Sequence, residues 1–282
     1  MTKKQKIFSG LGAVAALGII YFIYEHFMYV TTDNAQVEAH SVLIASKVGG
    51  YIKEVHISEG MKVKKDDILF EIDDRDYQNT LRQIKGELSS LEAQKKDLDR
   101  NAKRLSELYS KGVVSQQQFD ASSTAFAGAR AKYEAISAQV AQAELNLENT
   151  KVRAPSDGYI AKRSVEVGQL AAPGVPMVGF VDSGERWVTA NFKETEIEGV
   201  QPGKAVDISI DAFSGKNFKG EVESVSSATG ATFTLLPPDN ATGNFTKVVQ
   251  RVPVKIKILN VSPEEVNVLK AGLSAYVKVH KH

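Results

Sequence analysis

The sequence predicts an α+β protein of several domains, in which a two-part β-sandwich is interrupted by a helical hairpin and followed by a β-barrel. Three observations lead to this fold class. The segment 152–182 repeats the segment 44–74 with an offset of 108 residues and no gap. Between the two copies, apolar residues recur with the seven-residue period of paired helices. After Trp187, apolar and polar residues alternate, as they do in strands.

The composition excludes several classes of function. The chain of 282 residues carries 35 Lys and Arg against 34 Asp and Glu, so no basic field is present to hold nucleic acid. The absence of cysteine excludes disulfides, thiolate metal sites, a cysteine nucleophile and a lipid-modified N-terminal cysteine. The five histidines are scattered, and no Gly-x-Ser-x-Gly motif occurs. We therefore expect no enzymatic activity, no cofactor and no metal.

A membrane anchor is predicted within residues 1–30. From Ile7 to Tyr24 the chain is uncharged and mostly apolar, which approaches the roughly 20 residues that cross a bilayer as a helix. Residues 27–30 can extend this stretch. Three lysines precede it, so the positive-inside rule predicts a single-pass protein with a cytoplasmic N-terminus. A cleavable signal peptide is the alternative, but its small-residue site, residues 13–15, lies inside the apolar run.

The repeat predicts one small β-sandwich made of two half-modules. Gly158-Tyr159-Ile160 repeats Gly50-Tyr51-Ile52, and Gly168 repeats Gly60. A half-module of about 30 residues cannot bury its own apolar face, so the two copies are expected to fold onto each other. The changes of period then predict the following boundaries. They are a polar tether at 31–41, the first half-module at 42–74, a hairpin at 75–150, the second half-module at 151–185 and a barrel at 186–282.

Two heptad seams predict that the insert is an antiparallel coiled-coil hairpin. The first seam contains Tyr77, Leu81, Ile84, Leu88, Leu91, Leu98, Ala102, Leu105 and Tyr109, and Lys95 interrupts it. The second contains Phe119, Phe126, Tyr133, Val140 and Leu147, with Ser122, Ala129, Ile136 and Ala143 three positions later. Between the seams, Lys111 to Ser115 supplies a helix-ending glycine and a capping serine. A coiled coil that pairs with a second chain is the alternative.

The C-terminal region predicts a small antiparallel barrel. Val206, Ile208 and Ile210 alternate with polar residues, and the segment 252–258 does the same. Short strands punctuated by glycine are typical of such barrels. The stretch 226–246 is too long for an ordinary connection, and loops of this length are usually functional or mobile.

The half-modules resemble the halves of biotinyl and lipoyl carrier domains. In those carriers the modified lysine lies on the turn that joins the halves. Lys62 lies inside the first half instead, and the hairpin occupies the junction. A lipoyl-like β-sandwich is therefore expected, and a biotinyl or lipoyl carrier subunit is the less favoured function.

The order of anchor, split lipoyl-like module, hairpin and barrel resembles the periplasmic adaptors, or membrane fusion proteins, of the HlyD and EmrA type. The resemblance covers nearly the whole chain. Its most recognisable stretches are 32–37 after the anchor, 111–115 in the hairpin turn, 150–158 on return to the sandwich, and 191–195, 235–244 and 247–254 in the barrel region. The three stretches in the barrel region look like the EmrA branch.

The resemblance implies a binding site at the tip of the hairpin. Family adaptors engage the outer-membrane channel through an Arg, a Leu four positions later and a Ser seven positions beyond that, which this chain matches at Arg104, Leu108 and Ser115. Gly112 and Val113 in the turn belong to the same expected site. Arg104 and Leu108 lie one helical turn apart on one face. The alternative is that Leu108 only closes the hairpin core and Ser115 only caps the second helix.

The family also implies a function and its partners. The chain is expected to be an inner-membrane-anchored adaptor with its bulk in the bacterial periplasm, self-associated in a ring or funnel beneath a TolC-like outer-membrane channel. The chain ends soon after the barrel, which leaves no room for the extra domain of adaptors for resistance-nodulation pumps. A transporter of the major-facilitator type is therefore the favoured partner, and multidrug efflux the favoured task. An adaptor for protein or peptide secretion is the alternative.

Overall fold

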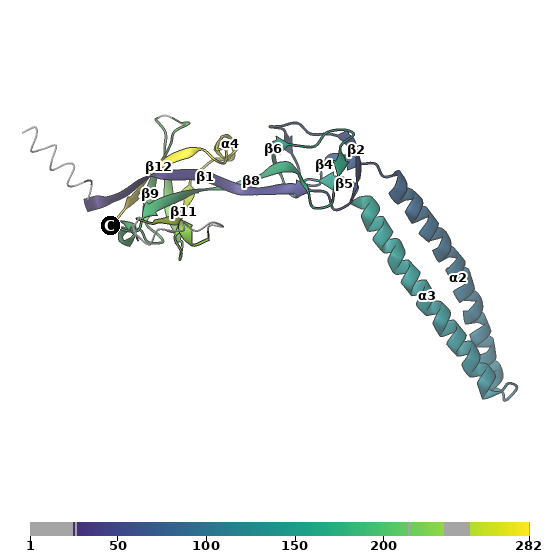
Figure 1. Cartoon of the computed structure of the whole chain (residues 1–282). Coiled ribbons are helices and arrows are strands. Elements are labelled where there is room, and N and C mark those ends of the chain that lie inside the picture. Colours follow the sequence, from purple (N-terminus) through teal and green to yellow (C-terminus); the bar gives the residue numbers. More distant parts are fainter. Residues whose placement is uncertain (1–24, 26, 214, 234–248, 282) are drawn as a thin grey trace, which may run out of the picture. The chain divides into compact units, whose positions relative to one another are not determined.

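The computed structural model describes residues 25, 27–213, 215–233 and 249–281 (Figure 1). The chain divides into two units, one formed by Val42–Phe180 and the other by the described residues before and after that segment. The predicted membrane span at 7–24 lies outside the described residues, as does most of the loop at 226–246. Within the described part of the chain, no helix has both the length and the apolarity that a membrane crossing requires.

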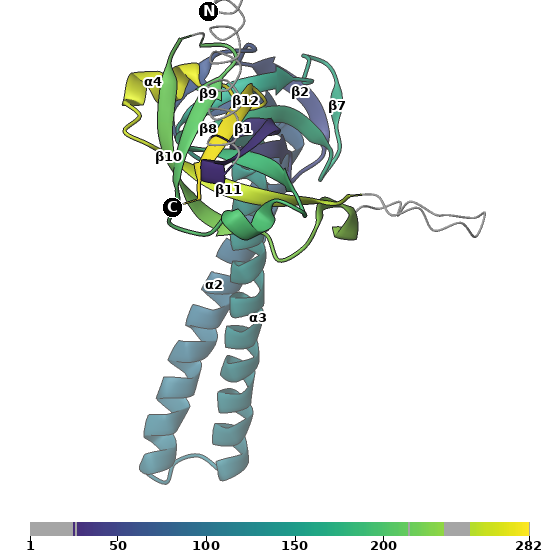
Figure 2. The same cartoon turned by 90° about the vertical axis from the view of Figure 1, so that its left-hand side faces the viewer.

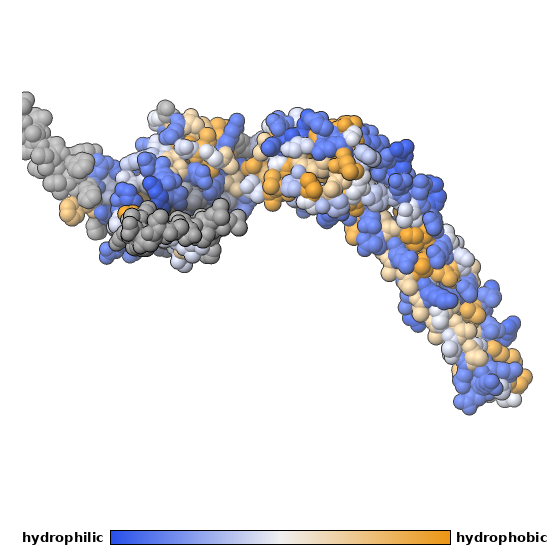
Figure 3. All heavy atoms as spheres, viewed as in Figure 1, coloured by the Kyte–Doolittle hydropathy of each residue, from blue (hydrophilic) through white to orange (hydrophobic). Residues whose placement is uncertain are grey.

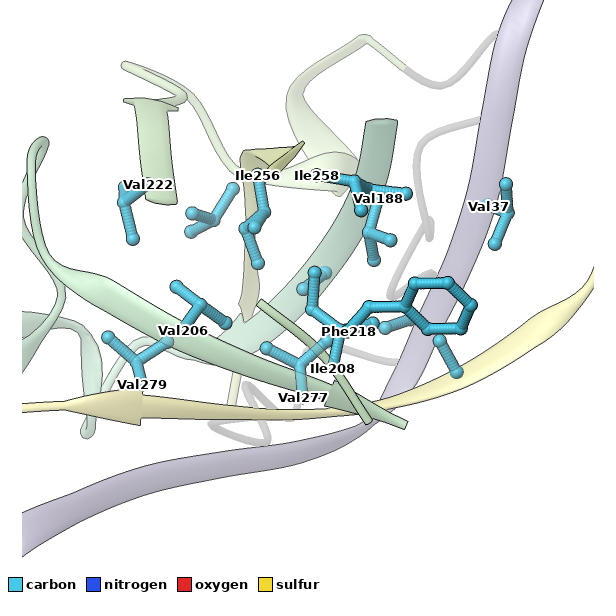
Figure 4. Packing of buried hydrophobic residues seen from close by; sticks show 14 of the residues in the cluster. Val37, Val188, Val206, Ile208, Phe218, Val222, Ile256, Ile258, Val277 and Val279 are labelled. Atoms are coloured by element: carbon cyan, nitrogen blue, oxygen red, sulfur yellow. The ribbon is translucent and has the colours of Figure 1, made fainter. Parts of the chain in front are cut away.

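Six strands form a closed barrel, as the alternation in the sequence predicted. They are β1 (Tyr29–Ala45), β8 (Pro176–Lys193), β9 (Ala205–Ile210), β10 (Asn217–Val225), β11 (Arg251–Leu259) and β12 (Ser274–His280). Their order in the sheet is β1-β12-β9-β10-β11-β8, and a pairing of β1 with β8 completes the circle. Val188, Ile208, Ile256 and Val277 are fully buried in its core (Figure 4). The unit also contains the short helices η1 (Ile197–Gly199), η2 (Gly230–Phe233) and α4 (Pro263–Val268).

The segment expected to be a polar tether, residues 31–41, is instead part of the barrel. It forms most of β1, which also includes Tyr29 and Val30 from the end of the expected anchor. Val30 is 4 % exposed and Val37 is completely buried in the barrel core. The inward residues do not keep a strict period of two, because a bulge shifts the register between Thr32 and Ala35. This shift, together with the polar composition, concealed the strand in the sequence.

Side-chain hydrogen bonds join β1 to β8 where the barrel closes. Thr32 donates its hydroxyl hydrogen to the carbonyl oxygen of Asn191 at 2.9 Å, and the side-chain amide of Asn191 donates to Asn34 at 3.1 Å. The indole Nε1 of Trp187 donates to Glu38 at 3.0 Å. Two of the stretches that carried the family resemblance, 32–37 and 191–195, therefore meet at one seam. β8 runs through the boundary expected at residue 185, and its part from Val181 onward belongs to the barrel unit.

The two copies of the repeat form one sandwich with matching strands. Its strands are β2 (Gly50–Val55), β3 (Lys62–Val63), β4 (Ile68–Ile72), β5 (Lys151–Arg153), β6 (Gly158–Arg163), β7 (Leu170–Ala171) and the first part of β8. Each copy supplies strands to the other, because β3 pairs with β6 and β2 pairs with β7. The amide of Gly60 donates to the carbonyl of Ile160 at 2.8 Å, and that of Gly168 donates to Ile52 at the same distance. Neither half is complete alone.

Replacing Gly220 by alanine should destabilise the barrel. A Cβ atom at this position in β10 would lie 2.8 Å from the Cδ1 atom of Ile208 and 2.8 Å from the carbonyl oxygen of Lys257. Such overpacking costs about 1–3 kcal/mol. The loss in free energy of unfolding is measured by urea titration, with the fluorescence of Trp187, the single tryptophan, as the signal. Gly230→Ala is the matched control, since its Cβ would meet no heavy atom within 4 Å. Equal urea concentrations at the unfolding midpoint for both variants would contradict the packing argument.

Candidate partner-binding site at the hairpin tip

Two long helices, α2 (Arg75–Ser110) and α3 (Gln116–Glu148), form the hairpin. They run side by side and are joined by a short turn (Figure 2). The apolar seam predicted for the first helix is half-buried from Tyr77 to Leu105, including Lys95. In the second helix the buried residues are Ser122, Ala129, Val140 and Ala143. The predicted coiled-coil hairpin is therefore confirmed, with large residues and small residues packed against each other.

Three contacts show that the helices keep one register from the tip to the base. The rings of Tyr109 and Phe119 are stacked, with centroids 5.2 Å apart and planes 6° apart. Farther from the tip, the Lys95 ammonium lies 3.4 Å from the centroid of the Tyr133 ring. Nearer the base, Lys85 and Glu144 form a 2.7 Å ion pair. The lysine that interrupts the seam is therefore held by an aromatic face.

The turn closes through the backbone of its glycine. Gly112 has a φ of 70°, in the left-handed region that residues with a Cβ rarely adopt. Its amide donates to the carbonyl of Tyr109 at 2.9 Å, and the amide of Val113 donates to that of Leu108 at 3.0 Å. These bonds satisfy carbonyl groups at the end of α2, as helix-ending glycines commonly do.

Ser115 begins α3 with a capping box. Its hydroxyl accepts a hydrogen bond from the amide of Gln118 at 3.3 Å, and its own amide donates to the side-chain oxygen of Gln118 at 3.1 Å. The predicted capping role is confirmed. Ser115 as a whole is exposed, so the geometry also allows a contact with a partner.

All five expected site residues lie in the last two turns of α2, the turn, or the start of α3. Figure 3 shows apolar (orange) and hydrophilic (blue) residues beside one another at this end of the hairpin. Val113 is 67 % exposed, a large fraction for an apolar side chain. Arg104 is exposed and donates to Asn101 of its own helix at 2.8 Å, so its remaining donors face solvent. Leu108 is half-buried, which agrees with a share in closing the hairpin core.

Tyr109 is the residue of the tip that the sequence assigned only to the seam. It is 40 % exposed, although one face of its ring is stacked on Phe119. Its carbonyl accepts the hydrogen bond from Gly112 in the turn, so its exposed part lies at the same end of the hairpin as Val113. The signal in the sequence was its position at the very end of the seam, where a seam residue has no further helical turn to cover it.

Several bonds fix the hairpin to the sandwich at its root. The amide of Ile72 donates to the carbonyl of Thr150 at 2.8 Å, and the Tyr77 hydroxyl donates to the carbonyl of Gly49 at 2.7 Å. Hydrogen bonds from the side chain and then the amide of Arg75 lower the pKa of Asp73 to about 2. The carboxylate at this root therefore stays ionised near neutral pH.

In the part of the chain that the structure describes, the geometry shows neither a metal site nor a lysine at the carrier position. Among the described residues, no three His, Asp or Glu side chains gather as metal ligands would. Lys62 lies on β3, with its ammonium 5.9 Å from the centroid of the Tyr159 ring. The connection between the halves is the hairpin itself, so Lys62 is not at the position that carriers modify.

Comparison with known families decides the identity of the fold. Residues 40–182 match the family model described as "RND MFP, barrel-sandwich hybrid domain", where MFP denotes a membrane fusion protein. Residues 186–280 match the "AAEA-like beta-barrel domain". The chain belongs to the membrane fusion protein family. The homologues found by these comparisons are adaptor proteins of efflux pumps, which are not enzymes.

Relatives place this membrane fusion protein near the EmrA type. It is 31 % identical to the colistin resistance protein EmrA of Acinetobacter baumannii, over 97 % of this chain and 93 % of that protein. It is 30 % identical to the multidrug export protein EmrA of Escherichia coli, over 94 % of this chain and 80 % of that protein.

Solved structures share the fold at low sequence identity. The periplasmic adaptor protein EmrA has a TM-score of 0.51 at 18 % identity and covers 90 % of this chain and 99 % of its own. A MacA-MexA chimera carrying the Pseudomonas aeruginosa MexA α-hairpin has a TM-score of 0.65 at 22 % identity, over 90 % of this chain and 82 % of its own.

Proposed function

We propose that this membrane fusion protein is the inner-membrane-anchored periplasmic adaptor of a tripartite multidrug efflux system. It links a major-facilitator-type transporter to a TolC-like outer-membrane channel. The observation that carries the proposal is the hairpin, whose arms are paired with each other in one register and whose tip exposes Val113, Arg104 and Ser115. The names of the EmrA relatives, a multidrug export protein and a colistin resistance protein, support the choice of efflux.

The role of the hairpin in this proposal is mechanical. Helices of 36 and 33 residues extend about 50 Å at 1.5 Å per residue. Because the seam residues are used within the hairpin, the surfaces left for other proteins are the tip and the outer faces. Several copies packed in a ring or funnel would present several tips to one channel. The transporter supplies the energy, and the adaptor supplies the connection.

The tip offers two kinds of contact to a channel. Val113 and the exposed part of Tyr109 form an apolar end that can enter a notch on the partner. The Arg104 guanidinium and the Ser115 hydroxyl supply hydrogen bonds to carbonyl or carboxylate oxygens beside it. An apolar centre with polar groups around it is the usual anatomy of a specific interface.

Cross-linking in cells tests the assignment of the tip. Because the chain contains no cysteine, a single cysteine replacing Arg104 or Ser115 provides one reactive position. We expect a thiol-to-amine cross-linker to capture an outer-membrane channel from these positions. Glu92, exposed on α2 away from the turn, is the matched control and should capture none. Equal capture from Glu92 would remove the tip assignment.

Substitutions of Ser115 separate its capping role from a contact with the partner. Ser115→Asp keeps an N-cap side chain, whereas Ser115→Ala loses about 1 kcal/mol of capping free energy. If the hydroxyl also binds the channel, both variants lower drug resistance, although only the alanine variant lowers the melting temperature. Full resistance in the aspartate variant would restrict Ser115 to capping.

Deletion of the gene distinguishes drug efflux from the secretion alternative. We expect sensitivity to hydrophobic toxicants to increase, measured as minimal inhibitory concentrations. The unaltered gene should restore resistance when it is expressed from a plasmid. Loss of an exported polypeptide with unchanged drug sensitivity would assign the adaptor to secretion instead.

A further inference from the structure

An open groove of about 710 Å³ crosses the outside of the barrel where β1 begins. We call it the anchor-side groove. Tyr29 lies in it on β1 and Tyr276 on β12, while Lys193, Glu196 and Glu198 come from the end of β8 and the η1 turn. Val30 points into the core, so its neighbour Tyr29 faces outward, because side chains alternate along a strand. The groove is therefore a surface feature distinct from the hairpin tip.

The chain itself connects this groove to the predicted anchor. Glu25 lines the groove and directly follows the apolar stretch that ends at Tyr24. Phe27, two residues farther on, is 69 % exposed. Aromatic residues concentrate at the depth of lipid headgroups beside membrane spans. If the anchor spans the inner membrane, as the proposed function requires, the groove opens at the level of the headgroups.

The groove carries both signs of charge in positions that a ligand can reach. Lys193 and Glu196 form a 3.4 Å ion pair, with side chains 56 % and 38 % exposed. Exposed pairs of this kind contribute about 0–1 kcal/mol, so a ligand can open them at little cost. Lys281 adds a second ammonium group to the lining. Glu198 is exposed and makes no ion pair within the described chain.

An ammonium group is already held by this type of lining. The ammonium of Lys278 lies 4.1 Å from the centroid of the Tyr29 ring and 2.6 Å from a carboxylate oxygen of Glu25. A phenol ring together with a carboxylate is a favourable setting for an organic ammonium ion. Tyr276 and Glu198 supply the same two chemical groups elsewhere in the groove.

We propose that the anchor-side groove binds the phosphoethanolamine headgroup of a membrane phospholipid. Lys193 and Lys281 face the phosphate, and Glu198 with the Tyr276 ring faces the ammonium group. An anion alone would face the Glu198 carboxylate, and a cation alone would face the ammonium groups of Lys193 and Lys281. A zwitterion can place its negative group near the lysines and its positive group near Glu198. Such a headgroup would hold the barrel against the membrane surface independently of the transporter.

The test uses the full-length protein in detergent and soluble headgroup analogues. A cysteine in place of Thr195, an exposed residue of the groove, carries an environment-sensitive fluorophore, and the rest of the chain has no thiol. Glycerophosphoethanolamine should give a saturable signal. Glycerophosphate, which has only the negative charge, and tetraethylammonium, which has only the positive charge, should each bind at least about tenfold more weakly.

Charge-removing variants identify the residues that bind. Glu198→Gln and Lys281→Met should each weaken glycerophosphoethanolamine binding about tenfold. Glu223→Gln, which removes a carboxylate paired with Lys255 elsewhere on the barrel, should leave binding unchanged. An unaltered titration in the Glu198 and Lys281 variants overturns the proposal. Binding of tetraethylammonium as strong as that of glycerophosphoethanolamine overturns it too and assigns the groove to organic cations.

The titration is independent of the efflux assembly. It requires no transporter, channel or intact bilayer, so a negative result leaves the tip cross-linking experiment untouched. Conversely, a failure to capture a channel from the tip would not alter the binding curves.

Discussion

Deleting one heptad from each arm of the hairpin should abolish drug resistance while leaving a folded protein. The segments to remove are 88–94 in α2 and 134–140 in α3. They face each other, because the contacts Lys95–Tyr133 and Tyr109–Phe119 set one antiparallel register. Removing seven residues from each arm keeps the heptad phase and shortens the hairpin by about 10 Å. A connector that must span a fixed gap cannot tolerate this loss.

Three measurements check the result. Circular dichroism should show a cooperative melt, minimal inhibitory concentrations should fall to those of the deletion strain, and a cysteine at position 104 should no longer capture the channel. Removing 88–94 alone is the control, since it leaves seam residues of α3 without partners and should unfold the hairpin. Normal resistance in the doubly shortened variant would show that the length of the hairpin is not what the assembly uses.

Replacing Val37 by aspartate should unfold the barrel. Val37 is completely buried on β1 (Figure 4), and its amide and carbonyl bond to Leu273 and Gly272 at 2.8 Å. A carboxylate there would have no partner within the barrel core, so we expect a loss of at least about 4 kcal/mol. Trp187 on the adjoining β8 reports the unfolding through its fluorescence.

The neighbouring position supplies the control for this prediction. Gln36 lies on the same strand but is exposed, so Gln36→Asp should change the free energy of unfolding by no more than about 0.5 kcal/mol. If residues 31–41 were only a tether, Val37→Asp would be equally harmless. The comparison therefore tests whether this segment closes the barrel.

The hairpin and the repeat could be predicted from the sequence because each depends on a strict period. Seam residues such as Leu88 and Val140 recur at heptad spacing, and one insertion in either arm would have broken the pattern. The halves of the sandwich are related by one constant offset, and their strands pair as the repeat required. Periodicity of this kind survives in the sequence because packing acts on every repeat.

Other features depend on contacts that periodicity does not encode. β1 was missed because its bulge between Thr32 and Ala35 interrupts the alternation and its closing partners lie far away in the chain. Lys95 was taken as a break in the seam, because only the register of the two arms places it over Tyr133. The five tip residues came from the family pattern. That Ser115 forms a complete capping box and that Tyr109 shares the exposed end followed only from the structure.

The exchange of strands between the two halves of the sandwich has a consequence for how the chain folds. As the protein emerges during synthesis, β2, β3 and β4 lack the partner strands β7, β6 and β5, because those strands follow the whole hairpin. Helical hairpins have mostly local contacts and form quickly. Once α2 and α3 have paired, Ile72 and Thr150 are held together at the root. The paired helices hold the end of β4 beside the start of β5, so these two strands can pair without first bringing distant parts of the chain together. The loop-closure entropy that a long flexible insert would cost is therefore avoided. We therefore expect the hairpin to form before the sandwich and to bring the two halves of the sandwich together.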